Sequence, residues 1–337
     1  MEKKLPTALW TEFSHQTVRP LDGGLINGTW QVGNPPVGVL QSLSSIFSPE
    51  VNEDIAAITS VLKRKGLDSP VLLETIDGRL WHEDAEGTCW RALSWVEGVT
   101  HHRIPDAALA HEAGRLVGRW HRALSGEHHT FSFTRPGAHD TAAHMQTLER
   151  AVEAHSAHRL RDQIGPLAQE IQERWASWRG QLDGPLMLAH GDLKISNLRF
   201  SEAGEGVALL DLDTMGYLSR DVEMGDAWRS WCNQSAEDSE QAVFSLEFFE
   251  ASARGYLSVC ELTAQERELL PYGVERICLE LAARFAADAL QESYFGWSPK
   301  VAPTRGEHNL IRARGQLSLA RSVRSQLGEM EAVLKRV

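Results

Sequence analysis

The chain has 337 residues, enough to bury a large core and, we expect, to form two lobes rather than one. Its 34 basic and 46 acidic residues give a net charge of −12, which argues against nucleic acid or an anionic lipid surface as a partner. The cysteines follow no metal-ligand spacing, so we expect reduced thiols. No apolar run approaches the ~18 residues of a membrane span, and residues 1–13 lack the apolar core of a signal peptide, so we predict a soluble cytoplasmic protein.

Residues 1–96 are predicted to form mainly strands with one helix. Ser48 and Pro49 are typical of a helix N-cap and first helical residue, and apolar residues then recur at helical spacing as far as Gly66. Asp77-Gly78 predicts a hairpin turn. The predicted strands are 17–21, 25–32, 37–43, 71–76, 79–82 and 88–95.

Residues 97–337 are predicted to be mainly helical. The predicted helices are one capped by Asp106, then 141–154, 165–178, 240–258, 264–292 and 317–334. A short strand pair, 198–200 and 207–210, interrupts them. A small antiparallel β lobe with one helix (1–96) followed by a larger helical lobe (97–337) is the order of an α+β, two-lobed, protein-kinase-like fold.

The most informative motif is His190-Gly191-Asp192-Leu193-Lys194-Ile195-Ser196-Asn197, followed after a strand pair by Asp211. It is similar to the protein-kinase catalytic loop H-R-D-L-x-x-x-N. We predict Asp192 as the general base, and Asn197 and Asp211 as ligands of Mg²⁺ held against the phosphates of ATP. At the position of Gly191 protein kinases usually have an arginine that pairs with a phosphorylated activation loop. Its absence favours a kinase that is not regulated by such phosphorylation and that acts on a small molecule.

Three flanking side chains have more than one interpretation. Lys194 is predicted to reach the transferring phosphate, the alternative being a solvated lysine. His190 is expected to brace the loop, the alternative being a part in the chemistry. Asp213 is predicted either to take a second metal position or to accept a hydrogen bond from the loop backbone.

The strand-rich half carries the predicted nucleotide site. Gly23-Gly24 suits a turn that lays backbone N–H groups over phosphates, although such a pair is also an ordinary hairpin. The third strand should carry a lysine, as in V-A-I-K, but has Gln41, so a catalytically dead pseudokinase is a live alternative. Trp95 and Val96, at the end of the last strand, are expected to border the nucleotide.

These residues resemble the aminoglycoside phosphotransferase and choline kinase superfamily, and most closely its N-acetylhexosamine 1-kinase group. The resemblance covers nearly the whole chain. Its motifs are 23–29 (glycine loop), 39–41 (third strand, also without lysine), 136–141, 210–215 with 224–229, and 305–314. The group has a histidine where this chain has Leu25, a departure that bears on sugar specificity.

The resemblance implies further site residues. Asn27 and Thr29 would join Gly23, Gly24 and Gln41 at the nucleotide. The implied substrate residues are His139, Asp226, Arg229, Arg305, His308 and Arg312. For the last three the alternative is a helix start with surface arginines.

We therefore predict an ATP- and Mg²⁺-dependent kinase that phosphorylates a sugar hydroxyl, and the closer resemblance implies the anomeric hydroxyl of an N-acetylhexosamine. The alternatives are an aminoglycoside, choline or homoserine kinase, or a nucleotide-binding regulator without catalysis. The expected partner is a small molecule, and the expected state is a monomer or weak dimer.

Overall fold

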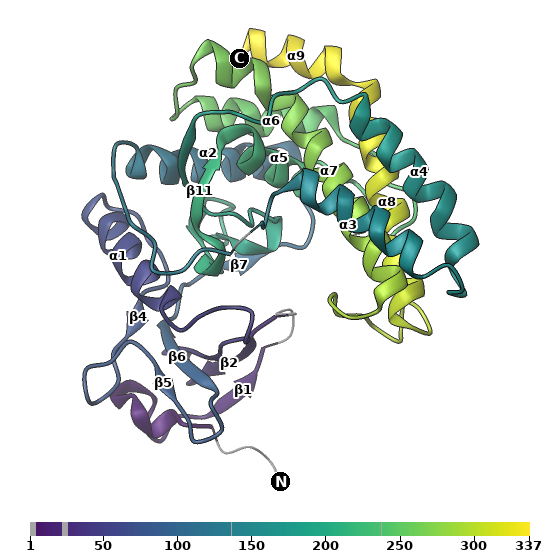
Figure 1. The fold of residues 1–337 in the computed structure, drawn as a ribbon. Coiled ribbons are helices and arrows are strands. Elements are labelled where there is room, and N and C mark those ends of the chain that lie inside the picture. The colour runs from purple at the N-terminus through teal and green to yellow at the C-terminus, as the bar shows by residue number, and fades with distance from the viewer. Residues whose placement is uncertain (1–4, 22–25, 136, 237) are drawn as a thin grey trace.

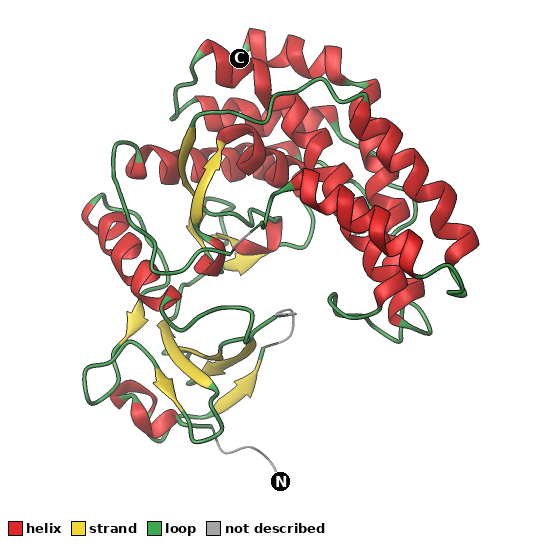
Figure 2. Cartoon of the chain, viewed as in Figure 1, coloured by secondary structure: helices red, strands yellow, loops and turns green. Residues whose placement is uncertain are grey.

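The computed structural model describes residues 5–21, 26–135, 137–236 and 238–337. Figure 1 shows a small strand-rich region that carries the N-terminus and, above it, a larger helical region that carries the C-terminus on α9 (Leu327–Arg336). The division between strands and helices is plain in Figure 2. The predicted α+β fold is confirmed, whereas the boundary at residue 96 stays a prediction.

One antiparallel sheet makes up most of the small region. Its strands are β1 (Val18–Pro20), β2 (Gly28–Val32), β3 (Gly38–Ser42), β4 (Leu72–Leu73), β5 (His82–Glu83) and β6 (Cys89–Ser94). The order is β1-β2-β3-β6-β4, and β5 also pairs with β6. In the β3–β6 register Gln41 lies directly opposite Arg91, a pairing that matters for the site.

The predicted hairpin across Asp77-Gly78 forms only as a turn. The Thr75 N–H donates to the Arg79 carbonyl at 2.8 Å, but β4 and β5 each pair with β6 and not with each other. The prediction of a two-stranded hairpin was therefore wrong, because β6 offers both segments a longer partner.

Helix α1 (Val51–Arg64) begins later than Ser48-Pro49 predicts. The Ser48 hydroxyl donates to the Glu50 carboxylate instead of capping the helix. Ile55, Ile58 and Leu62 are buried, as the apolar spacing predicts.

The helical region contains eight further helices among the described residues. They are α2 (Ala107–Leu124), α3 (Thr141–Ala154), α4 (Arg161–Ala176), α5 (Arg220–Trp231), α6 (Leu246–Leu257), α7 (Ala264–Gln291), α8 (Arg305–Ser325) and α9. The predictions for α2, α3 and α7 are confirmed; Asp106 and Asp140 cap α2 and α3, and Thr263 with Glu266 forms a capping box on α7. The other three helix predictions differ from the structure: α4 begins at Arg161, α6 begins at Leu246, and the single helix predicted at 317–334 is replaced by two helices, α8 and α9.

Helix α5 was not predicted. Its polar residues Asp221, Glu223, Asp226 and Arg229 are buried together with its apolar residues. A helix buried on all sides carries no apolar stripe, so hydrophobic spacing does not reveal it.

Five short strands frame the loops between α4 and α5. They are β7 (Val99–Thr100), β8 (Leu186–Ala189), β9 (Leu198–Phe200), β10 (Gly206–Leu209) and β11 (Gly216–Ser219). The predicted β9–β10 pair is confirmed, β7 adds to β9, and β8 pairs with β11. Residues 190–197 leave β8, and Asp211 follows β10, so two strand ends carry the predicted chemistry.

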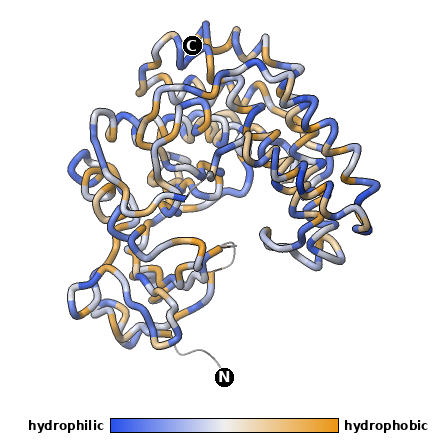
Figure 3. The backbone as a smooth tube through the Cα atoms, viewed as in Figure 1, coloured by the Kyte–Doolittle hydropathy of each residue, from blue (hydrophilic) through white to orange (hydrophobic). Residues whose placement is uncertain are grey.

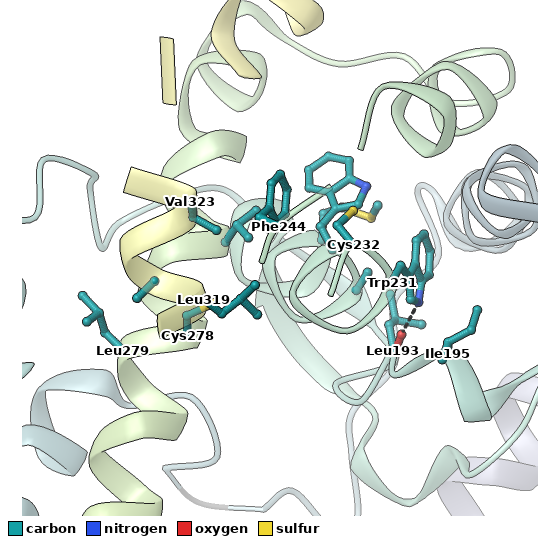
Figure 4. Packing of buried hydrophobic residues seen from close by; sticks show 14 of the residues in the cluster. Leu193, Ile195, Trp231, Cys232, Phe244, Cys278, Leu279, Leu319 and Val323 are labelled. Carbon is teal, nitrogen blue, oxygen red and sulfur yellow. Dashed lines mark hydrogen bonds between the residues drawn. The ribbon is translucent and has the colours of Figure 1, made fainter. Parts of the chain in front are cut away.

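The large core fixes the loop that follows β8. Figure 4 shows Leu193 and Ile195 turned toward Trp231 of α5, whose Nε1–H donates to the Leu193 carbonyl at 2.8 Å. Both loop side chains are at most 3% exposed. The apolar residues of the loop therefore anchor it, and the polar residues between them are held at fixed positions.

Hydrophobic and hydrophilic residues alternate along most helices in Figure 3, as expected for helices that each cover part of a core. None of the helices in the described part of the chain has the length and apolar character needed to span a membrane. Cys89, Cys232, Cys260 and Cys278 are all free and buried.

Candidate active site

Gly191 sets the path of the loop that carries the predicted base. Its φ is +79°, and a Cβ atom on it would lie 2.3 Å from the Thr214 carbonyl oxygen. Both the backbone conformation and the close approach therefore require glycine. An arginine, as in protein kinases, does not fit at this position.

His190 braces the loop, as expected. Its ring is fully buried, and Nε2 donates to the Leu210 carbonyl at 2.8 Å. The backbone N–H groups of His190 and Gly191 donate to the two carboxylate oxygens of Glu223, at 2.8 and 3.0 Å. Glu223 on α5 thus holds the start of the loop by its main chain.

The side chains of Asp192, Lys194, Asn197 and Asp211 converge. Lys194 Nζ lies 2.7 Å from Asp192 Oδ2 and 3.8 Å from Asp211 Oδ2. Asn197 Nδ2 donates to Asp192 Oδ2 at 3.0 Å and to the Asp192 carbonyl at 2.9 Å. The two carboxyl groups are 26% and 38% exposed, so both face a polar, accessible space and not the packed core.

The two carboxyl groups differ in acidity. Burial works to raise the pKa of Asp192, but the Lys194 ammonium outweighs it and the pKa lies below its usual range. Burial raises the pKa of Asp211 to about 6, and the neighbouring Asp213 and Asp192 carboxylates add to the rise. Asp192 is thus ionised at neutral pH, as a general base must be, while Asp211 lies among negative charges where a cation would be stabilised.

The donor set fits a magnesium ion that arrives with phosphates. Across residues 5–21, 26–135, 137–236 and 238–337, no three His, Cys, Asp or Glu side chains form a metal cluster. Mg²⁺ commonly uses one or two protein oxygens and takes its other ligands from water and substrate phosphates. The amide of Asn197 and the carboxylate of Asp211 match that pattern.

Asp213 is paired with residues of the strand-rich region. Its carboxylate is fully buried and accepts from Arg91 Nη1 at 2.5 Å and Nη2 at 2.8 Å. Asn27 Nδ2 also donates to it, at 2.7 Å. The structure places Asp213 in a buried salt bridge with Arg91, and a second metal position for it stays a prediction.

The predicted nucleotide residues are only partly described. Gly23 and Gly24 lie outside the described residues. Asn27 is buried and its Oδ1 accepts from the Ser44 N–H at 2.9 Å. Thr29 and Gln41 lie opposite each other in β2 and β3, and Gln41 Nε2 donates to Thr29 Oγ1 at 3.3 Å.

Trp95 and Val96 form the connection from β6 toward β7. The Val96 carbonyl accepts from Arg199 Nε at 3.1 Å, and the Arg199 guanidinium lies 5.4 Å from the centre of the Trp95 ring. Arg199 therefore links this connection to β9. Strand β9 begins directly after the η3 turn (Ile195–Asn197).

Three of the predicted substrate residues lie beside the base. His139 Nε2 is 3.4 Å from the Gly191 carbonyl, and its Nδ1 is 3.1 Å from Glu280 of α7. Arg229 and Asp226 form an ion pair at 2.9 Å on α5, and the Arg229 charge helps to lower the pKa of Asp192. The base is thus bordered by α5 and by the segment that leads into α3.

The other three predicted substrate residues have different partners. His308 Nε2 and Arg312 Nε both contact Asp238 Oδ1, at 2.7 and 2.8 Å, and Arg305 Nη1 donates to the Glu292 carbonyl at 2.8 Å. The structure therefore assigns these side chains to holding the segments around 238 and 292–298 onto α8. Arg312 is only 7% exposed, so the alternative of surface arginines was wrong for it, and a part for these three residues in substrate binding stays a prediction.

Sequence reasoning missed several residues that shape the site. They are Arg91, Glu223, Glu280 and Arg284. No local motif marks them, because each reaches the site from another strand or helix; Arg91, for example, is brought to Gln41 by the β3–β6 register.

Comparisons with known proteins agree with this geometry. The sequence pattern of a family described as "Phosphotransferase enzyme family" matches residues 17–262. Among solved structures, a microcompartment-associated aminopropanol kinase is similar with a TM-score of 0.64 and 18% identity, over 95% of this chain and 96% of that one. A choline/ethanolamine kinase family protein from Mesorhizobium loti has a TM-score of 0.57 and 15% identity, over 97% and 95%.

An amicoumacin kinase in complex with AMP-PNP, Ca²⁺ and Ami is also similar, with a TM-score of 0.60 and 14% identity over 91% of this chain and 90% of that one. At these identities the solved structures show a shared fold. They confirm the predicted kinase-like architecture.

Proposed function

Because this chain belongs to the phosphotransferase enzyme family, we propose that it transfers the γ-phosphate of ATP to a hydroxyl group of a small, sugar-like molecule. The observation that carries the proposal is the convergence of Asp192, Lys194, Asn197 and Asp211. Phosphoryl transfer depends mainly on positioning and on charge stabilisation, and this set of residues supplies both.

Each residue has a chemical role in the proposal. Asp192 accepts the proton of the attacking hydroxyl as its oxygen bonds to the γ-phosphorus and the bond to the ADP oxygen breaks. Lys194, now paired with Asp192, reaches the transferring phosphate. Asn197 and Asp211 hold Mg²⁺, which when bound neutralises phosphate charge.

The strand-rich region provides the proposed nucleotide site. Gly23 and Gly24, which lie outside the described residues, and Asn27, Thr29 and Gln41 are the residues proposed to contact the phosphates. Trp95 and Val96 border the base of the nucleotide. The amicoumacin kinase of similar fold was solved in complex with AMP-PNP, which supports ATP as the phosphate donor.

The wall beside the base favours a hydroxyl-rich substrate. His139 is paired with Glu280, and the pKa of His139 is raised because this pairing outweighs burial. Arg284 lies one helical turn beyond Glu280 and only 4.0 Å from it, and its side chain is 16% exposed. Paired charges and an additional arginine suit hydroxyl and carbonyl oxygens better than a polycation, which supports a sugar over an aminoglycoside.

The finer candidate is the anomeric hydroxyl of an N-acetylhexosamine. It rests on the resemblance of segments 23–29, 210–215, 224–229 and 305–314, and Leu25 departs from that group's pattern. Arg284 could donate to an acetamido carbonyl, a group that simple hexoses lack.

A second candidate is an amino alcohol as acceptor. Asp226 Oδ2 is buried and has no hydrogen-bond partner in the described part of the chain. An ammonium group that carries N–H donors would satisfy it. Two proteins of similar fold are named an aminopropanol kinase and a choline/ethanolamine kinase family protein, and these names refer to amino alcohols. A non-catalytic nucleotide-binding regulator is the remaining alternative, and the intact Asp192, Asn197 and Asp211 argue against it.

The test is a coupled ADP-release screen with Mg-ATP against hexoses, N-acetylhexosamines, amino alcohols including choline and homoserine, and aminoglycosides. We expect turnover on an uncharged sugar, with Asp192→Asn as the inactive control. Preference for an amino alcohol would select the second candidate. An ATP affinity that does not depend on Mg²⁺, together with no turnover on any acceptor, would favour the non-catalytic regulator.

A further inference from the structure

The lysine that the third strand lacks has a structural counterpart on the neighbouring strand. Gln41 of β3 faces Arg91 of β6 in the sheet register, and Arg91 Nε donates to Gln41 Oε1 at 2.9 Å. A cation is therefore present beside the position where the kinase pattern expects one, but it comes from β6.

The two terminal nitrogens of Arg91 bond to two other elements. Nη1 and Nη2 donate to Asp213 of the turn η4 (Leu212–Thr214), and Nη1 lies 3.3 Å from Asn52 Oδ1 on α1. The fork of the guanidinium matches the carboxylate in a bidentate pair. Burial works to lower the pKa of Arg91, but the Asp213 carboxylate outweighs it and raises the value above its usual range. The pair is therefore fully ionised although Arg91 is only 1% exposed.

Asp213 also accepts a hydrogen bond from a second residue of the strand-rich region. Asn27 Nδ2 donates to Asp213 at 2.7 Å, and Asn27 Oδ1 accepts from the Ser44 N–H at 2.9 Å. Arg91 and Asn27 thus meet on one carboxylate that is 122 and 186 residues away along the chain. This carboxylate bonds directly to Arg91 of β6 and to Asn27, which precedes β2, and through Arg91 it is linked to Gln41 of β3 and Asn52 of α1.

The same turn carries the proposed magnesium ligand. Asp211 has φ +62° and ψ +60°, a left-handed conformation that is uncommon for a residue other than glycine. Such a conformation persists where surrounding contacts hold it. Asp213, two residues on, is held at both oxygens by residues of the strand-rich region.

We propose that Arg91 is a positioning residue that replaces the missing strand lysine. Through its ion pair with Asp213 it links the nucleotide-binding strands to the η4 turn and keeps Asp211 in the orientation that binds metal and phosphate. This inference rests on the proposed kinase function. Arg91 acts through Asp213 and not by touching phosphate, because its guanidinium is buried and occupied.

Stability alone does not explain such a pair. A buried ion pair often contributes little net stability compared with apolar residues of similar volume. Its known use is to fix one arrangement among several, which is what a joint between distant segments requires. The inference therefore predicts effects on nucleotide and metal binding beyond any effect on folding.

The most discriminating variant restores the lysine. In Gln41→Lys the new ammonium lies beside the Arg91 guanidinium, repels it and removes its acceptor. We expect the affinity for Mg-AMP-PNP, measured by calorimetric titration, to fall about tenfold. Gln41→Met, of similar length and without charge, should lose less. If Gln41 were merely an eroded lysine position, Gln41→Lys would bind the nucleotide more tightly, and that result, or an unchanged affinity, would overturn the inference.

A second series removes the arginine itself. We expect Arg91→Met to weaken Mg-AMP-PNP binding about tenfold or more and to raise the Mg²⁺ concentration for half-saturation, and Arg91→Lys to recover part of the loss. The matched control is Arg324→Met on α8, which also removes an arginine bound to both oxygens of a buried carboxylate, Glu275, at 2.7 and 2.8 Å. It should lose stability and bind nucleotide as the wild type does.

The outcomes separate the two proposals. A folded Arg91→Met variant with wild-type nucleotide affinity and Mg²⁺ dependence would contradict the role of Arg91. If that variant does not fold, the Gln41→Lys comparison decides. Wild-type protein that binds no Mg-AMP-PNP would instead contradict the proposed kinase function.

Discussion

Lys194 and Asp192 form an ion pair with 2.7 Å between Nζ and Oδ2. The pair keeps the proposed base ionised and also occupies one of its oxygens. An incoming γ-phosphate would draw the ammonium toward itself and leave that oxygen able to accept a proton from the substrate hydroxyl. The pair therefore connects phosphate binding with activation of the base.

Replacement of the base should abolish turnover without abolishing nucleotide binding. We expect Asp192→Asn to reduce kcat by about 10²–10⁴-fold, because general-base help has that size. The affinity for Mg-AMP-PNP should change by less than about threefold, since the magnesium ligands remain. Steady-state kinetics on the acceptor found in the screen, with calorimetry in parallel, measure both. Equal losses in binding and turnover would place Asp192 in the metal site instead.

Replacement of the proposed magnesium ligand should have the opposite signature. Asp211→Asn keeps the shape of the side chain but removes its charge, so Mg²⁺ loses a carboxylate oxygen. We expect the Mg²⁺ concentration for half-maximal activity to rise about tenfold or more and the thermal unfolding of the metal-free protein to be no worse than that of the wild type, because burial already raises the pKa of Asp211 to about 6. An unchanged Mg²⁺ requirement would show that the assignment is wrong.

Gly191 should not tolerate even alanine. A Cβ there would meet the Thr214 carbonyl at 2.3 Å in a left-handed backbone conformation, so Gly191→Ala should lower the free energy of unfolding by about 3 kcal/mol. Gly204→Ala is the matched control, since Gly204 also has a positive φ (+84°) but a Cβ there would have nothing within 4 Å. It should cost about 1 kcal/mol. Urea unfolding curves compare the two, and equal losses would remove the steric argument.

These relationships divide into those that the sequence reveals and those that it does not. The catalytic loop could be predicted because its polar residues are consecutive and its apolar residues, Leu193 and Ile195, anchor it locally. Helix α3 could be predicted because Asp140 caps it and its apolar face is regular. Each of these features is written within a short window of residues.

The remainder depends on packing that no short window contains. The Arg91–Asp213 pair needs the register of β3 on β6 and the placement of η4 against α1. Helix α5 is buried on all sides, so its polar residues look like those of a loop. Of the residues predicted to reach the substrate from 305–314, His308 and Arg312 bond to Asp238 and Arg305 bonds to the Glu292 carbonyl, contacts that the sequence alone does not show.

Removal of Arg312 should therefore affect stability and not substrate binding. Arg312→Met loses the hydrogen bonds to Asp238 and to the Gly296 carbonyl, so we expect a loss of about 1–3 kcal/mol in the free energy of unfolding. Michaelis constants for both substrates should stay within about twofold. The control is Arg314→Met, on the same helix as Arg312. It removes an exposed ion pair with Glu240 and should lower the free energy of unfolding by less than about 1 kcal/mol. A raised KM in a fully stable Arg312→Met protein would return this residue to the substrate site.

The His139–Glu280 pair predicts a pH dependence with a definite sign. Burial works to lower the pKa of His139, but the hydrogen bond and charge of Glu280 outweigh it and raise the value. A raised pKa means that the folded state binds the proton more tightly than the unfolded state, so the stabilisation is complete below about pH 6.5 and is lost as pH rises through the folded value. His139→Gln should therefore be less stable than the wild type by about 2 kcal/mol near pH 6, and the difference should shrink toward pH 9.

His144 on α3, the helix that follows His139, provides a control of opposite sign. Burial lowers its pKa, so its neutral form is the stabilised one, and the difference between wild type and His144→Gln should grow as pH rises toward about 6.5. Urea unfolding at several pH values measures both differences. Parallel curves for the two variants would mean that the Glu280 contact does not hold a proton on His139, and the wall beside Asp192 would then carry one positive charge fewer than the substrate argument requires.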